Sequence, residues 1–74
     1  MKNFGKIIKF NGAYGNIKGT DGKDYILLDK NIIDKNIKVA DDVEFEPETI
    51  KTPEIEVNVA VFVKTLKKNN NNSD

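Results

Sequence analysis

The chain has 74 residues, enough for one small domain that buries only about 60% of its unfolded surface. It carries 12 Lys and 12 acidic residues, so its net charge is zero, and it contains no Cys, His, Arg or Trp. Without Cys or His it lacks the side chains for disulfides, thiolate metal sites, thiol nucleophiles and imidazole acid–base catalysis. We therefore expect no enzyme, no metal site and no cofactor.

The hydropathy of the chain gives no sign of a membrane segment. No apolar run approaches the roughly 20 residues that cross a bilayer. The opening stretch Met1-Lys2-Asn3-Phe4-Gly5 does not have the pattern of a signal peptide. We expect a soluble cytoplasmic protein without a membrane partner.

The charges are unevenly distributed along the chain. Residues 1–40 hold eight Lys and four acidic residues, whereas residues 41–63 hold one Lys and seven acidic residues. Two interpretations remain open: an ordinary solvated surface, or a basic binding face with an acidic back. Because Arg is absent, any phosphate contact depends on Lys, which offers a point charge and no bidentate fork.

The first two predicted strands form a hairpin. They cover Asn3–Phe10 and Tyr14–Gly19, and Asn11-Gly12 between them is a typical hairpin turn. Gly15 interrupts the second strand near its start. A glycine at such a position predicts a bend, or a close approach by another backbone or a ligand.

A third strand is predicted after a second turn. Residues 20–23 contain Asp21-Gly22, a strong turn signal, and residues 24–29 are rich in aromatic and branched side chains. The acidic residues around Gly22 are too few for a calcium loop, which needs repeated oxygen ligands. We expect a plain turn there and a three-stranded meander overall.

A single helical turn is expected after the third strand. Asp29 is the predicted cap of this turn, with Ile32 or Ile33 in the core. The pattern then becomes loop-like, with Ile37 and Val39 as its predicted hydrophobic anchors.

The fourth strand is predicted to be short. Residues 42–46 alternate between polar and apolar side chains, as a half-buried strand does. Pro47 should end the pairing of this strand on one side, and residues 48–53 read as a connecting loop.

The last strand is predicted over residues 55–66. Ile55 and the following valines alternate with other residues, but Ala60 and Phe62 make the second side apolar as well. Either both faces of this strand are covered near its end, or a bulge switches the faces.

Five short strands with a helical turn after the third predict an all-β fold over residues 1–66: a small, five-stranded antiparallel OB-type barrel. Closure would remove the exposed edges that an open five-stranded sheet leaves. An SH3-like barrel is the alternative on pattern alone. Residues 67–74 form a polar, Asn-rich tail that we expect to be disordered.

The order of short motifs from Lys2 to Leu66 resembles the cold-shock domain. The stretches that carry the resemblance are Gly5-Lys6-Ile7-Ile8-Lys9-Phe10-Asn11, Tyr14-Gly15-Asn16-Ile17, Asp24-Tyr25-Ile26-Leu27-Leu28, Val43-Glu44-Phe45-Glu46, and Ala60 with Val63 and Leu66. The resemblance implies an OB barrel whose second and third strands bind single-stranded RNA or DNA. In that family such binding supports RNA chaperoning or the regulation of gene expression.

This chain departs from the family at the stacking positions. Lys9 stands where the family has a Trp, and Asn16 where it has a second aromatic residue. Ile26, Leu28 and Asp29 replace the aromatic residues and the histidine of the second motif. Because each stacked base contributes roughly 1–3 kcal/mol, we expect weak, salt-sensitive binding.

The resemblance assigns a role to each residue of the expected nucleic-acid site. Lysines would contact phosphates, one tyrosine would stack on a base, one asparagine would form hydrogen bonds, and aliphatic side chains would form an apolar floor. The expected site residues are Lys6, Ile8, Lys9, Tyr14, Asn16, Lys18, Ile26 and Leu28.

A second function of a different class fits the same residues. Ile8, Tyr14, Ile26 and Leu28 would form an exposed apolar face, which is typical of a contact with a protein partner or a second copy. Two registers remain open for this face. A slip by one residue would turn these side chains into the core, whereas Ile7, Ile17, Tyr25 and Leu27 already form an inward set of the right parity.

Overall fold

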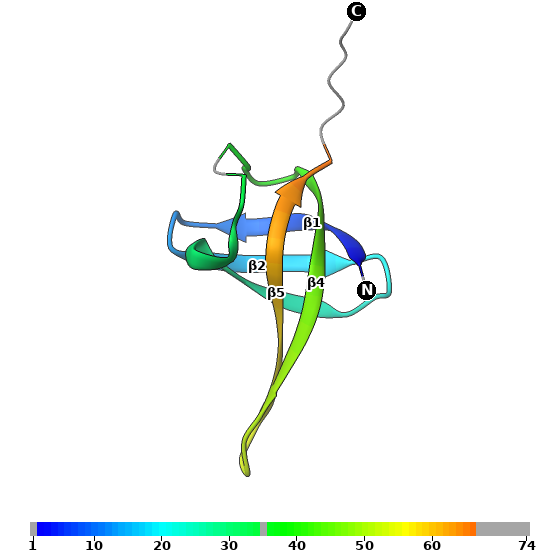
Figure 1. The fold of residues 1–74 in the computed structure, drawn as a ribbon, viewed down its shortest axis with the longest axis vertical. Helices are drawn as coiled ribbons and strands as arrows, with labels where there is room; N and C mark the ends of the chain where they lie inside the picture. Colours follow the sequence, from blue (N-terminus) through cyan, green and yellow to red (C-terminus); the bar gives the residue numbers. More distant parts are fainter. Residues whose placement is uncertain (1, 35, 67–74) are drawn as a thin grey trace, which may run out of the picture.

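The computed structural model describes residues 2–34 and 36–66, so the predicted disorder of residues 67–74 lies outside the described residues. Every regular element is a strand except one 3-10 turn (Figure 1). The elements in chain order are β1 (Asn3–Phe10), β2 (Tyr14–Gly19), β3 (Asp24–Leu28), η1 (Asp29–Asn31), β4 (Asp42–Lys51) and β5 (Glu56–Thr65). The bounds predicted for the first two strands are confirmed, and β3 ends one residue earlier than predicted.

The strands close into a barrel in the order β1-β2-β3-β5-β4. This order, with η1 after the third strand, confirms the OB-type barrel in preference to the SH3-like alternative. The expectation of a purely antiparallel barrel was wrong, because β3 and β5 pair in parallel through Ile26 with Val59 and Leu27 with Ala60. A closed ring of five strands cannot alternate direction at every step, so one neighbouring pair has to be parallel.

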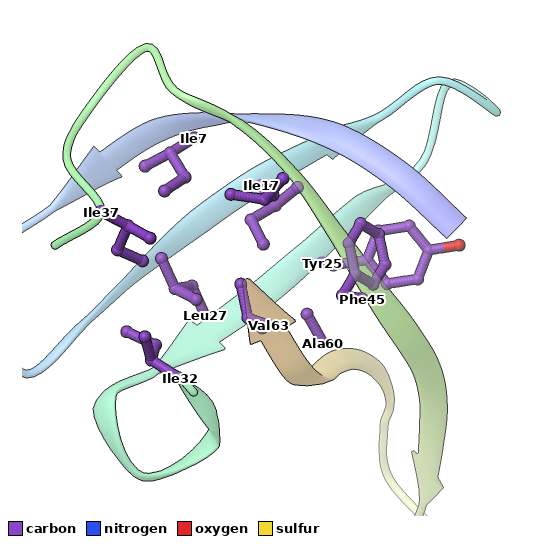
Figure 2. Close-up of a cluster of buried hydrophobic side chains, with 10 residues drawn as sticks. Ile7, Ile17, Tyr25, Leu27, Ile32, Ile37, Phe45, Ala60 and Val63 are labelled. Carbon is purple, nitrogen blue, oxygen red and sulfur yellow. The ribbon is translucent and has the colours of Figure 1, made fainter. Parts of the chain in front are cut away.

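The barrel is filled by ten buried side chains, most of which Figure 2 labels. They are Ile7, Ile17, Tyr25, Leu27, Ile32, Ile37, Val43, Phe45, Ala60 and Val63. The predicted inward set of the first three strands is therefore confirmed, and the one-residue slip was wrong.

Tyr25 links the core to the barrel's surface. Its ring lies beside that of Phe45, with centroids 4.8 Å apart and a tilt of 58°. Its hydroxyl donates a hydrogen bond of 2.6 Å to the Asp21 carboxylate, and the Asn3 amide donates to the same hydroxyl. The hydrogen bond from Tyr25 holds the pKa of Asp21 below its ordinary value. The 20–23 stretch is thus a turn tied to the core.

The segment after β3 differs in two details from the sequence prediction. Leu28 occupies the N-cap position and Asp29 already lies inside the 3-10 turn, so the predicted cap was wrong. Ile32 enters the core and bridges to Val63, while Ile33 points outward. Ile37 is a buried anchor as predicted; Val39 is exposed, so that part of the prediction was wrong.

β4 is twice as long as predicted, since it runs through Pro47 to Lys51 and pairs with β5 along its length. The predicted loop at residues 48–53 was therefore wrong for residues 48–51, and the connection between the strands lies at residues 52–55. Pairing with β1 stops at Phe45, which agrees with the expectation that Pro47 ends pairing on one side. A proline is tolerated there because β4 has only one partner beyond this point. The two strands continue together away from the barrel (Figure 1); we call residues 48–58 the arm.

A bulge interrupts β5 on the barrel side of the arm. Between the pairs Glu46 with Val61 and Glu44 with Lys64, β5 has one more residue than β4. Phe62 lies in this bulge with a φ of 54° and is exposed, whereas Ala60 is fully buried. Of the two explanations for the doubly apolar strand, the bulge is the one confirmed.

Candidate nucleic-acid interface

The eight predicted site residues lie on the outer face of β1, β2 and β3, and we call this face the platform. Residues directly opposite each other on neighbouring strands share a face, so the cross-strand register assigns their side. The pairs on the outer face are Lys6 with Lys18, Lys9 with Asn16, Asn16 with Ile26, and Tyr14 with Leu28. The structure therefore brings the predicted residues together on one surface.

A bulge in β1 explains how Ile8 and Lys9 reach the same face. Ile7 pairs with Ile17 and Lys9 pairs with Asn16, so Ile8 has no opposite residue on β2. Strict alternation would turn one of these consecutive side chains inward. The bulge removes that constraint, and both side chains are exposed, Ile8 at 53%.

Gly15 allows the two strands to meet at this bulge. A Cβ atom at Gly15 would overlap the backbone carbonyl oxygen of Lys9 and crowd the backbone of Phe10. The prediction of a close backbone approach at Gly15 is thus confirmed. The glycine fixes where Lys9 stands relative to Tyr14.

Tyr14 is held at the start of β2 by the preceding turn. The Asn11 side-chain oxygen accepts hydrogen bonds from the backbone N–H groups of Ala13 and Tyr14, at 2.9 and 3.0 Å. Gly12 lies between Asn11 and Ala13 and has a φ of 96°, which suits a residue without a Cβ atom. The Tyr14 side chain is 60% exposed beside half-buried Leu28, so one flat aromatic surface faces solvent.

The three predicted phosphate-binding lysines differ in their surroundings. Lys6 lies 3.0 Å from Asp42 and Lys18 lies 3.5 Å from Asp24, and all four side chains are largely exposed. Lys9 makes no ion pair with any residue in the described ranges 2–34 and 36–66. Lys9 is therefore the cation of the platform that a phosphate can reach without displacing a carboxylate.

The two carboxylates that hold Lys6 and Lys18 were missed in the sequence. Asp24 could have been found, because the hairpin register puts it directly opposite Lys18. Asp42 pairs with Lys6 across β1 and β4, a contact between distant segments that no local pattern signals.

An apolar neighbour of the platform on β5 was also missed. Val59 is only 4% exposed, yet it is not part of the barrel core, since its neighbour Ala60 faces the core instead. Val59 pairs with Ile26 on one side and with Glu48 on the other. Val59 is therefore a buried apolar contact on the outer side of the sheet, next to Ile26 of the platform. The alternation in this strand could not reveal it, because both of its sides are apolar.

The described residues contain neither a carboxylate cluster for a metal ion nor a membrane-spanning helix. Within these residues, no group of three or more acidic side chains is arranged to hold a metal ion. None of the helical structure in the same residues is long and apolar enough to cross a membrane.

A platform with exposed Tyr14, with Lys9 outside any ion pair of the described residues, and with a half-buried aliphatic floor can offer a single stacking surface and weak electrostatic attraction. A scan against models of protein families and a search of curated proteins both returned no match.

Proposed function

We propose that the chain binds single-stranded RNA or DNA weakly through the platform, as its similarity to the cold-shock domain implies. The observation that carries this proposal is the position of Tyr14, exposed on the second strand of an OB-type barrel and near Lys9, which makes no ion pair within the described residues. The faces of strands two and three are the usual oligonucleotide-binding surface of this type of barrel.

The side chains suggest a division of roles. Tyr14 stacks on one base, Asn16 offers hydrogen bonds, and Ile26 with Leu28 forms the floor. Lys9 contacts a phosphate directly, while Lys6 and Lys18 contribute after exchanging their carboxylate partners. With one stacking surface and few free cations, the expected Kd at physiological salt is on the order of 0.1 mM.

A titration of a fluorescent poly-pyrimidine oligonucleotide at low and at physiological salt tests this function. Tyr14→Ala should weaken binding by about 1 kcal/mol or more, roughly fivefold, because a stacked base loses its partner. Phe62→Ala is a matched control, since Phe62 is exposed to the same 60% but lies outside the platform. Lys9→Gln should lower the slope of log affinity against log salt by about one.

Two outcomes would contradict the proposal. No measurable binding at low salt would remove nucleic-acid binding altogether. Equal losses for Tyr14→Ala and Phe62→Ala would place the binding surface elsewhere on the barrel.

A second function, protein binding through the same face, is favoured by the continuous apolar surface. Ile8 and Tyr14 are exposed, and Ile26 and Leu28 are half-buried beside them on the same face. Contiguous apolar surface of this kind commonly marks a protein contact. If the oligonucleotide does not bind, protein binding through the platform becomes the preferred function.

A further inference from the structure

We infer that the arm of one copy of the chain covers the platform of a second copy. The inference deepens the second proposed function, protein binding through the platform, and names its partner. It does not rest on nucleic-acid binding, although both contacts would use the same platform.

The arm has two faces of different chemistry. On one face Ile50 lies opposite Val57, next to the pair Glu48 with Val59. The other face holds Lys51 opposite Glu56, and Thr49 opposite Asn58 with a side-chain hydrogen bond of 3.1 Å. The arm is thus an amphipathic ribbon with an aliphatic face.

The described residues leave the aliphatic face of the arm partly open to solvent. Ile50 is 47% exposed and Val57 is half-buried, because the barrel core ends near Ala60 and does not extend into the arm. A two-stranded ribbon without a packed face is only marginally stable in water. A partner that buries Ile50 and Val57 would therefore stabilise the arm as well as the complex.

Charge favours a second copy over nucleic acid as this partner. The arm contains three Glu and one Lys, so its carboxylates repel phosphate groups. The platform offers the complementary surface: exposed Ile8 and Tyr14 for the aliphatic face, and Lys9, which has no ion pair within the described residues, for the Glu48 carboxylate on that face. The chain as a whole has zero net charge, so two copies meet no overall repulsion.

The arrangement of the two surfaces suits two-fold symmetry. The arm's aliphatic face and the platform adjoin on the same side of the sheet, where Ile26 pairs with Val59. A two-fold axis near this pair lays each arm on the other copy's platform. The interface then contains the same contact twice, as an isologous dimer requires.

Sedimentation velocity over a range of protein concentrations tests the association. The weight-average sedimentation coefficient should rise with concentration, and Ile50→Lys should weaken the dimer by about tenfold or more, because an apolar side chain leaves the interface. Thr49→Lys is the matched control: it changes the charge equally on the same strand, but on the polar face. Thermal melting of both variants verifies that the barrel remains folded.

Disulfide trapping tests which surfaces meet, because the chain has no Cys of its own. Ile50→Cys mixed with Ile8→Cys should give a mixed disulfide in preference to either symmetric one, since the arm lies on the platform. Thr49→Cys mixed with Ile8→Cys should give little.

Three results would overturn the inference. They are a strict monomer up to millimolar protein, equal weakening by the two lysine variants, and a preference for the Ile50→Cys homodimer. None of them affects the oligonucleotide titration, which is run at low protein concentration. Failure of nucleic-acid binding likewise leaves these measurements unchanged.

Discussion

The platform and the arm both expose aliphatic side chains, but only the platform has a core beneath it. The inner sides of β1, β2 and β3 bury Ile7, Ile17, Tyr25 and Leu27. The arm has Thr49 and Asn58 on its second face, and its strands pair only with each other.

The two surfaces therefore depend on different contacts. The barrel core fixes the platform, so its outer residues can change with little effect on folding. The arm has no core beneath it, so its aliphatic face contributes little to the stability of a single copy. β4 belongs to both regions, and pairs of variants along this one strand can test the comparison directly.

The largest expected difference in stability is between substitutions at the two ends of β4. Phe45→Ala empties a buried site and should lower the free energy of unfolding by about 3–5 kcal/mol. Ile50→Ala, five positions along the strand but in the arm, should change it by less than about 0.5 kcal/mol. Urea denaturation followed by circular dichroism measures both values. A comparable loss for Ile50→Ala would show that the arm belongs to the cooperative unit of the barrel.

A smaller effect is expected at the β1 bulge that shapes the platform. Gly15→Ala places a methyl group against the Lys9 carbonyl oxygen and should cost about 2–3 kcal/mol, since backbone has to move. Gly12→Ala is the control, because no atom lies within 4 Å of its Cβ position and only the positive φ is strained. It should cost about 1 kcal/mol. If the two variants are equally stable in urea, the close approach at Gly15 is not a structural requirement.

Local patterns were sufficient to predict the strands of the platform. Alternation, Asn11-Gly12 and Asp21-Gly22 specify the three-stranded meander, and the inward set follows from its parity. The arm was missed because Pro47 and Pro53 are typical of a loop. Whether a proline ends a strand depends on which sides of the strand have partners, and here β1 stops pairing before it.

The face that the candidate residues share could be predicted from the sequence, but their contacts could not. The register puts seven of the eight on the outer face, and Ile8 is exposed in the β1 bulge. The ion pair of Lys6 with Asp42 depends on barrel closure, and the role of Val59 depends on the parallel pairing of β3 with β5. Contacts between such distant segments leave no signal in local sequence patterns.

The smallest change in stability is expected when either of two carboxylates on β4 is replaced. Glu44, in the barrel, lies between Lys2 and Lys64, at 3.2 and 3.5 Å from their Nζ atoms. The hydrogen bond and charge of Lys2, followed by those of Lys64, hold the pKa of Glu44 below its ordinary value of 4.5. Glu48, at the base of the arm, makes no ion pair within the described ranges.

Because the pKa of Glu44 is lower in the folded state, its stabilising contribution is complete above pH 4.5 and is lost as the pH falls through the folded value. Glu44→Gln should therefore lower the melting temperature at neutral pH, and the difference from the wild type should shrink on acidification. Glu48→Gln should leave the melting temperature nearly unchanged over the same range. If the melting-temperature difference between Glu44→Gln and the wild type is the same at all pH values, the ion pairs of Glu44 do not stabilise the barrel. The carboxylates of β4 would then act alike in the barrel and in the arm.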